Sequence, residues 1–313
     1  MSASARQARS LATRAGSFAM VGLVKALFAF ARLLGPERSS DLGGWIARVL
    51  GPLVPAHRTA LANLRAIYPE KSDAQIRAIA AGAWANLGRT GAEYAHLGTL
   101  IDYDPNNPDG CRTEVLGVEH FIALRDDAKP GLIFSAHLGN WELPAICAAR
   151  FGLEATAVFR PPNDPGVARI VHEVRSGTMG GLAASAGQGA AFAMTGVIER
   201  GGHLGQLIDQ HFTRGVPVDF MGKAAYANPL LAKLARHYDC PVHGVRVIRL
   251  SHHRFRLELT PPLDLPRDAG GLIDVEGAVQ AMQNVVEGWV REYPEQWLWM
   301  HRRWRERPQA RPQ

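Results

Sequence analysis

From residue 113 onward, short apolar runs alternate with longer stretches of helical spacing, and this alternation restricts the possible folds more than any other feature of the chain. Apolar runs that are rich in Val, Ile, Leu and Phe and end at turn residues predict strands, and the stretches between them predict helices. The predicted strands are residues 113–117, 131–136, 156–160, 203–209, 241–250 and 254–260. The predicted helices are residues 118–127, 140–150, 165–178, 188–200, 228–238 and 274–292. This order predicts an α/β fold with a mixed, largely parallel sheet that is flanked by helices and has an antiparallel edge.

The residues before this region are predicted to be helical. The segment from His57 to Tyr94 indicates two helices. The second should begin at Ser72, because Gln75 stands three positions later and completes a capping box.

Residues 16–35 form an apolar segment that nearly reaches the length of a membrane span. Lys25 lies at its middle, where insertion of a lysine costs about 3 kcal/mol. Arg14, Lys25 and Arg32 would share one side of a helix, a pattern that favours a helix lying in the membrane interface. A spanning helix and a buried helix remain the alternatives. A cleaved signal peptide is disfavoured, since Lys25 and Arg32 interrupt the apolar region that it needs.

The positive charge of the chain is concentrated at its two ends. The net charge is +6, and residues 1–50 and 301–313 carry +5 and +4, so the residues between them are slightly acidic. Basic ends suit an anionic membrane surface better than a nucleic-acid groove, since each Lys or Arg near anionic lipid contributes roughly 1 kcal/mol. Solvated basic tails are the alternative. The three cysteines are widely spaced and predict a reduced protein that faces the cytoplasm.

The stretch GLIFSAHLGNWELPAICAAR places a histidine where a strand should end and a glutamate five residues later. His137 and Glu142 would point apart on one continuous helix, so they can meet only if a helix begins between them. Gly139 supplies conformational freedom, Asn140 is a favoured N-cap, and Pro144 is tolerated in a first turn. The pattern therefore predicts that Glu142, in the first helical turn, accepts a hydrogen bond from one ring nitrogen of His137.

Such a pair can act as a general base, because the second ring nitrogen stays free to remove a proton from an alcohol that attacks a carbonyl. The N–H groups of Gly139 and Asn140 are candidate donors to the oxyanion. Other chemistries fit less well. No H-x-x-x-H or C-x-x-C spacing supports a zinc site, and neither a G-x-S-x-G elbow nor a phosphate loop occurs. Cys147 is predicted to be a core residue and not a nucleophile.

Several further segments occur in order around this stretch. They are ALANLRAIYPEKS and WANLGRTGAEY before it, then VFRPPNDP, RSGTMGG, LIDQH, GVPVDFMGK and finally PEQWLWMHRRWRERP. Together with HLGNWE they span roughly residues 57–308. In these segments the chain resembles the late acyltransferases of lipid A biosynthesis, the lauroyl and myristoyl transferases, within the lysophospholipid acyltransferase superfamily.

The resemblance implies an enzyme that moves a fatty acyl group from an acyl carrier protein thioester, its co-substrate, to a hydroxyl of a lipid A precursor. It implies no cofactor, no metal and no nucleic-acid partner, and a place at the membrane surface on the cytoplasmic face of the cell inner membrane. Residues 1–55 would then be a membrane-associating helical segment, residues 56–308 the acyltransferase domain and residues 309–313 a tail.

The resemblance also implies roles for single residues. His137 would be the general base and Glu142 its charge partner. The implied substrate-binding residues are Asn140, Arg160, Arg175 and Asp209. Both arginines would hold phosphate or sugar oxygens, with ordinary surface arginines as the alternative. Asp209 ends a predicted strand, where open α/β sheets place their ligands, although a turn or cap is the alternative.

Alternatives remain open at the end of the chain and for the substrate. Trp297, Trp299 and Trp304, with the arginines around them, suit the lipid headgroup layer, or the tryptophans pack into the core while the arginines are solvated. Gln210 stands where members of the family often carry a histidine. An acyltransferase of the same superfamily for a lysophospholipid, an ornithine lipid or a glycolipid is the alternative enzyme. A non-catalytic lipid-binding relative is the alternative outside enzymes.

Overall fold

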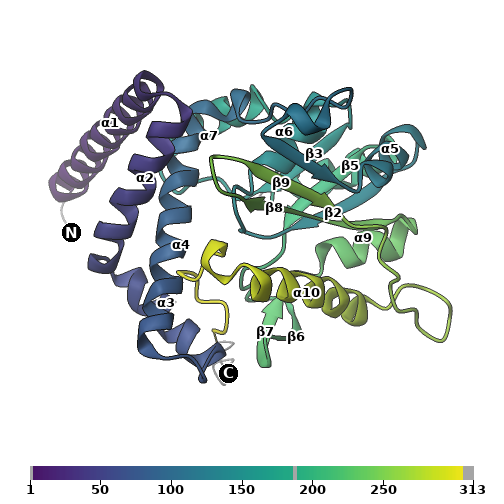
Figure 1. The fold of residues 1–313 in the computed structure, drawn as a ribbon. Coiled ribbons are helices and arrows are strands. Elements are labelled where there is room, and N and C mark those ends of the chain that lie inside the picture. The colour runs from purple at the N-terminus through teal and green to yellow at the C-terminus, as the bar shows by residue number, and fades with distance from the viewer. Residues whose placement is uncertain (1–2, 186–188, 306–313) are drawn as a thin grey trace.

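The computed structural model describes residues 3–185 and 189–305, which form a sheet covered by helices and a group of N-terminal helices along one side (Figure 1). The N-terminal elements are α1 (Ala3–Leu34), α2 (Pro36–Leu50), η1 (Gly51–Leu53), α3 (Pro55–Ile67), α4 (Asp73–Glu93), η2 (Tyr94–Thr99) and η3 (Pro108–Gly110). The predicted capping box opens α4. Ser72 Oγ accepts from the Gln75 N–H at 3.3 Å, and Gln75 Oε1 accepts from the Ser72 N–H at 2.8 Å.

Seven strands form one sheet in the order β1-β9-β8-β2-β5-β3-β4. They are β1 (Thr113–Leu116), β2 (Gly131–Ser135), β3 (Ala155–Phe159), β4 (Gly181–Ala184), β5 (His203–Leu207), β8 (Val242–Arg249) and β9 (Phe255–Leu259). All neighbouring pairs are parallel except β8 with β9, so β9 and β1 run opposite to the rest at one side of the sheet. The predicted fold class and largely parallel sheet are confirmed.

The sequence pattern misses three strands. β4 is short and consists of Gly, Leu and Ala, residues that carry little strand signal. β6 (Val216–Phe220) and β7 (Lys223–Ala227) form a separate antiparallel hairpin. Its turn residues Met221 and Gly222 both have positive φ, as a type I′ turn requires. The turn is not predicted from the sequence, because a methionine stands at the first position, where Asn, Asp or Gly is typical.

Helices cover both faces of the sheet. They are α5 (Val118–Asp126), α6 (Leu143–Arg150), α7 (Pro165–Ser176), α8 (Ala190–Glu199), α9 (Leu230–Tyr238) and α10 (Val275–Glu292), followed by η4 (Pro294–Gln296). Every residue of β2 is buried, as expected for a central strand that is covered on both sides. Leu132 and Phe134 belong to the core that α9 and α10 complete, whereas Ile133 packs in a second core with Ala148 of α6.

The C-terminal tryptophans pack in the core, so of the two alternatives the core packing is confirmed and the headgroup layer is wrong. Trp297 and Trp299 are 2% and 0% exposed, and their rings pack against each other and against Trp304. The cause is a backbone bridge between Trp297 and Leu138, which draws the segment against the sheet.

The arginines beside these tryptophans divide between core and surface. Arg303 is fully buried, and burial lowers the pKa of its guanidinium to about 10. Arg302 and Arg305 are exposed. Arg307 and the predicted tail at 309–313 lie outside the described residues.

Residues 16–34 of helix α1 are largely exposed. Within the described residues, Gly16–Leu34 is the helical segment that is long and apolar enough to cross a membrane, with a mean hydropathy of 1.8. Val21 packs closely against Gly166 at the start of α7, where a Cβ on the glycine would lie 2.4 Å from Val21 Cγ2. The large exposed apolar residues of α1 are Phe18, Met20, Leu23, Leu27, Phe30 and Leu33. The division of the chain at residue 55 stays a prediction.

Candidate active site

His137 and Asp209 meet at the carboxyl edge of the sheet. β2 and β5 are parallel neighbours whose register pairs Ser135 with Leu207, so the residues two positions further on also face each other. His137 Nδ1 lies 2.8 Å from Asp209 Oδ1, and the His137 N–H donates to Asp209 Oδ2 at 3.0 Å. Carboxyl ends of strands are where open α/β sheets place ligands. The predicted position of Asp209 at such a strand end is confirmed.

Asp209 is buried and ionised. It is 1% exposed, and Trp297 Nε1 also donates to its Oδ2, at 2.8 Å. Burial raises the pKa of Asp209, but the charge of His137 and the hydrogen bonds that His137 and Trp297 donate outweigh it and lower the pKa to about 2. Because an ionised carboxylate only accepts, His137 Nδ1 donates to Asp209 Oδ1, and Nε2 is the ring nitrogen that is not bound to the carboxylate. The side-chain nitrogen of Gln210 lies 3.2 Å from Nε2 and donates to it.

The predicted hydrogen bond between His137 and Glu142 is wrong. Helix α6 begins at Leu143, and Glu142 occupies the N-cap position without a side-chain cap bond. The carbonyl of Asn140 accepts from the Leu143 N–H at 3.1 Å. Its side chain binds on both sides, because Oδ1 accepts from the Glu142 N–H at 3.2 Å and Nδ2 donates to Glu93 of α4 at 2.8 Å. An aspartate after β5 therefore holds the histidine in place of the predicted glutamate.

Glu142 forms a buried ion pair with Arg175 of α7. Its carboxylate accepts from Arg175 Nε at 2.9 Å and Nη2 at 2.6 Å, and Tyr94 Oη also donates to it. Burial and the Glu142 carboxylate raise the pKa of Tyr94, so the phenol keeps its proton. Burial lowers the pKa of Arg175, but the hydrogen bonds and charge of Glu142 outweigh burial, so the pKa is raised overall. Arg175, predicted to bind phosphate, is thus already paired, and its guanidinium lies over the ring of Phe159.

The other predicted site residues lie in different environments. Asn140 was predicted to bind substrate, but its side chain is 0% exposed and donates to Glu93 Oε2 at 2.8 Å, so it is directed into the protein. Arg160 follows β3, is exposed and forms no ion pair with another described residue. The Gly139 N–H, predicted to face an oxyanion, donates to the Gln296 carbonyl at 3.2 Å. The Asn140 N–H has no acceptor within the described part of the chain.

A cavity of about 140 Å³ lies between the sheet and its helices, and His137 itself is not part of its wall. Trp141, Glu142 and Arg175 contribute to its wall, and the Trp141 ring lies 5.2 Å from the His137 ring. The rest of the wall is mostly apolar and comes largely from β1, β2, β3, β5, β8, β9 and α6. Cys147 also lines the cavity, but burial raises the pKa of its thiol to about 12, which excludes a thiolate nucleophile at neutral pH.

Four residues around His137 escape the sequence patterns. They are Tyr94, Gln210, Trp297 and His301. Each belongs to a segment that is distant from His137 in sequence. Those segments were identified only by the resemblance to a family. Among residues 3–185 and 189–305, no group of three His, Cys, Asp or Glu side chains is arranged to hold a metal ion.

Acid is expected to destabilise the fold through His301. Its Nε2 accepts from the His211 N–H at 2.8 Å, and burial lowers the pKa of His301 to about 4. Histidine in an unfolded chain has a pKa of about 6.5, so between pH 6.5 and 4 the unfolded state binds the proton more readily and stability falls as pH falls. His203 and His243, whose pKa values burial also lowers, act in the same direction. The melting temperature should therefore drop between pH 7 and 4.5, and less so in His301→Asn. An equal drop in both proteins would contradict this role of His301.

Nearly the whole chain is similar to a known protein family. A family model described as bacterial lipid A biosynthesis acyltransferase matches residues 6–306. The matched range includes the N-terminal helices, the sheet and the loop that carries His137. No curated protein matches the chain.

Proposed function

We propose that this chain, which belongs to the bacterial lipid A biosynthesis acyltransferase family, transfers a fatty acyl group from an acyl carrier protein thioester to a hydroxyl of a lipid A precursor. The observation that carries the proposal is His137, held by the buried Asp209 beside an apolar cavity. The carrier protein as donor, a lauroyl or myristoyl chain and a late step of acylation are parts of the proposal that go beyond the family.

His137 is the proposed general base. Its Nε2 takes the proton of the acceptor hydroxyl while that oxygen forms a bond to the thioester carbon, a role that contributes about 100- to 10,000-fold to the rate. Asp209 stabilises the imidazolium that forms. When the C–S bond breaks, the imidazolium returns the proton to the leaving sulfur, so the products are an ester and a thiol. The acceptor hydroxyl would take the place of the Gln210 amide at Nε2.

The Asn140 N–H is the proposed donor to the oxyanion. The Gly139 carbonyl accepts from Asn86 Nδ2 at 2.9 Å and from Thr90 Oγ1 at 3.1 Å, so it is directed toward α4. The C=O and N–H of a trans peptide point in opposite directions, and the Asn140 N–H is therefore directed away from α4. A preorganised donor of this kind stabilises a tetrahedral transition state by about 3 kcal/mol.

The apolar cavity is the proposed site of the acyl chain. Its wall includes Ile133, Leu182, Leu207, Val245 and Leu257. Each methylene buried against such a wall contributes about 0.8 kcal/mol, which favours a long saturated chain over a short one.

Glu142 and Arg175 lie beside this proposed acyl site, and Arg160 lies outside it. The ion pair of Glu142 with Arg175 holds α6 and α7 together at the cavity wall. Arg160 is exposed next to Phe159, which lines the cavity, and is the proposed cation for a phosphate of the acceptor or the carrier.

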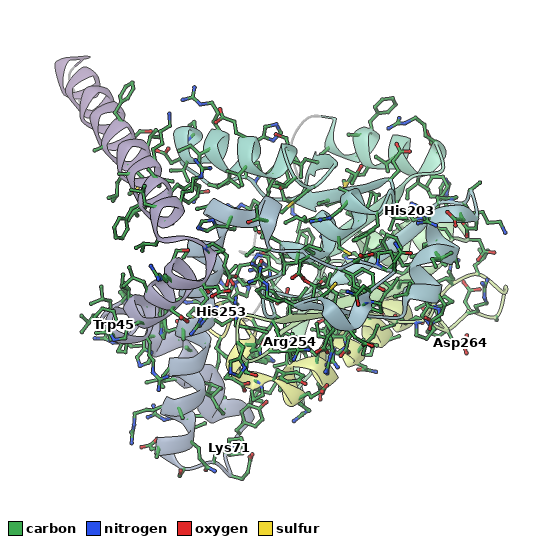
Figure 2. All side chains as sticks on the ribbon, turned by 45° about the horizontal axis from the view of Figure 1, so that its top comes forward. Trp45, Lys71, His203, His253, Arg254 and Asp264 are labelled. Carbon is green, nitrogen blue, oxygen red and sulfur yellow. The ribbon has the colours of Figure 1, made fainter. Side chains whose placement is uncertain are left out.

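Association with the cytoplasmic face of the inner membrane is proposed from the N-terminal helices. Two neighbouring helices expose apolar surface, and Figure 2 shows Trp45 projecting from the outer side of α2. The large exposed apolar residues of α2 and the turn after it are Trp45, Ile46, Val49, Leu50, Leu53 and Val54. Arg38 and Arg48 are exposed on the same helix and suit anionic headgroups.

Replacing exposed apolar residues of α1 is expected to release the protein from membranes. The variant Phe18→Gln/Leu23→Gln/Leu27→Gln should float with anionic phospholipid vesicles to a much smaller extent than the wild type, because each lost apolar side chain removes about 1.5–3 kcal/mol of burial. The double variant Phe192→Gln/Leu272→Gln, which changes exposed apolar residues elsewhere, is the control. Equal flotation of all three proteins would remove α1 as the anchor.

A transfer assay tests the proposed function. The purified protein receives acyl carrier protein loaded with chains of several lengths, together with either a Kdo-bearing tetra-acylated lipid A precursor or lysophosphatidic acid. Acylation of the first acceptor only is the expected result, and the preferred donor then gives the chain length. Acylation of lysophosphatidic acid only would assign the protein to another membrane lipid. No product with either acceptor would favour a lipid-binding relative without turnover.

A further inference from the structure

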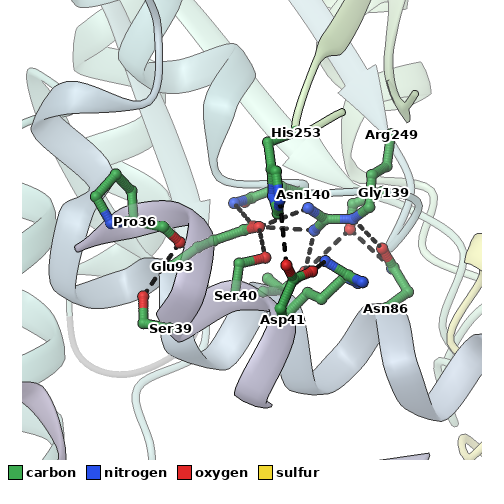
Figure 3. Close-up of polar contacts among 12 residues, drawn as sticks. Pro36, Ser39, Ser40, Asp41, Asn86, Glu93, Gly139, Asn140, Arg249 and His253 are labelled. Carbon is green, nitrogen blue, oxygen red and sulfur yellow. Dashed lines mark hydrogen bonds and ion pairs between the residues drawn. The ribbon is translucent and has the colours of Figure 1, made fainter. Parts of the chain in front are cut away.

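A row of buried polar residues on α4 holds the loop that follows β2. Asn86, Thr90 and Glu93 lie on one face of this helix and are 5%, 1% and 2% exposed. The first two donate to the Gly139 carbonyl, and Glu93 Oε2 accepts from Asn140 Nδ2. Figure 3 shows Asn86 and Glu93 beside these two loop residues. Three side chains of one helix thus bind two successive residues of the loop.

Glu93 carries a negative charge inside this network. Arg249, at the end of β8, donates to its Oε1 at 2.5 Å and to its Oε2 at 2.9 Å, which makes a bidentate ion pair. Burial raises the pKa of Glu93. The charge of Arg249 and the hydrogen bonds from Arg249, Ser40 and Asn140 outweigh burial, so the pKa is lowered overall. Arg249 Nε also donates to Asn86 Oδ1 at 3.1 Å. Since every group in the network is bound to another, its geometry depends on all of its donors.

One of those donors comes from a different helix. Ser40 Oγ of α2 donates to Glu93 Oε1 at 2.6 Å, and Ser40 is 2% exposed. α2 crosses α4 at very short distance, because a Cβ on Gly88 would lie 2.2 Å from the Gly43 carbonyl oxygen. The opposite side of α2 carries the exposed Trp45. α2 therefore lies between the outer apolar surface and the network.

We propose that Ser40 is a positioning residue for the catalytic loop. It acts through Glu93 and Asn140, whose Oδ1 in turn accepts from the Glu142 N–H at 3.2 Å. Through these contacts α2, whose outer side belongs to the proposed membrane surface, sets the position of the loop between His137 and α6. The catalytic part of this inference rests on the proposed function, and the structural part does not.

Ser39 provides a matched control for this role. It is also buried, at 3% exposure, and it stands next to Ser40 on the same helix. Its Oγ donates to the Pro36 carbonyl within α2 at 3.1 Å and does not reach the network (Figure 3). Ser39→Ala and Ser40→Ala therefore remove the same atom from neighbouring buried sites, and only the second removes a donor to Glu93.

Hydrogen–deuterium exchange of the peptide that covers residues 138–143 tests the structural part. Ser40→Ala should raise the exchange rate of its amides about tenfold, the effect of losing one hydrogen bond to a charged group, whereas Ser39→Ala should not. Exchange that stays the same in both variants would overturn the proposal. This measurement requires no substrate, so it separates a failure of the proposal from a failure of the proposed function.

Steady-state kinetics of transfer test the catalytic part. In Ser40→Ala we expect kcat to fall about tenfold with little change in KM for the acyl donor, because loop position affects the transition state more than the acyl cavity. Ser39→Ala should keep both values. A Ser40→Ala protein with faster exchange at the loop and an unchanged kcat would overturn the positioning role.

Discussion

Replacing Asp209 with asparagine is expected to lower kcat for acyl transfer by about 100- to 10,000-fold, as much as His137→Ala. Asp209 Oδ2 accepts from Trp297 Nε1 and from the His137 N–H, so the amide oxygen of an asparagine would be held on that side. The amide NH₂ would then face His137 Nδ1 and donate to it. The ring would carry its proton on Nε2, the wrong tautomer for a general base, and the imidazolium would lose its counter-charge.

Two comparisons isolate this effect. Asp219→Asn changes an exposed carboxylate on β6 and should keep transfer near the wild-type rate. The double variant His137→Ala/Asp209→Asn should be no worse than His137→Ala, because residues that act as one unit lose their function together. A rate for Asp209→Asn close to that of Asp219→Asn would show that the aspartate does not support the base.

Replacing Glu142 with alanine is expected to lower the free energy of unfolding by about 3–5 kcal/mol, the usual cost of leaving a buried charge without its partner. Glu142 and Arg175 have side chains that are 3% and 15% exposed, and the Tyr94 hydroxyl loses its acceptor in the same variant. Urea denaturation measures the loss. Transfer should also fall, because Glu142 and Arg175 form part of the cavity wall.

Helix α7, which carries Arg175, offers a control for the Glu142 prediction. Glu173 of α7 faces Arg169 at 3.8 Å, and both side chains are more than 60% exposed, so Glu173→Ala should cost less than about 1 kcal/mol. The double variant Glu142→Met/Arg175→Met removes both charges and should recover much of the stability. If that double variant is stable and still inactive, the pair acts in transfer and not only in folding. A Glu142→Ala protein as stable as Glu173→Ala would contradict the buried ion pair.

Local patterns predicted the elements of the fold that depend on neighbours in sequence. The start of α4 follows from Ser72 and Gln75, whose two hydrogen bonds close within one turn. Central strands such as β2 stand out because a strand buried on both faces must be apolar throughout. The hairpin of β6 and β7 lacks such a pattern, since it lies in a separate sheet and turns at Met221.

The residues of the candidate site were singled out from the sequence, but their contacts were predicted only in part. Asp209 was predicted to bind substrate, and Glu142 was paired with His137 because it is near in sequence. Asn140 Oδ1 accepts from the Glu142 N–H as a cap would, but the Glu142 carboxylate pairs with Arg175 of α7, a residue distant in sequence, and not with His137. The spacing of residues within the loop does not predict that contact.

The sequence by itself determined the α/β class, the positions of most strands and helices, and a histidine and an aspartate at strand ends. The tertiary structure alone decided which carboxylate serves His137. Asp209 is 72 residues away and becomes its partner because β5 lies next to β2 in a register that pairs Ser135 with Leu207. That adjacency arises when both faces of the sheet are buried at once, so it depends on the packing of the whole domain and not on any one segment.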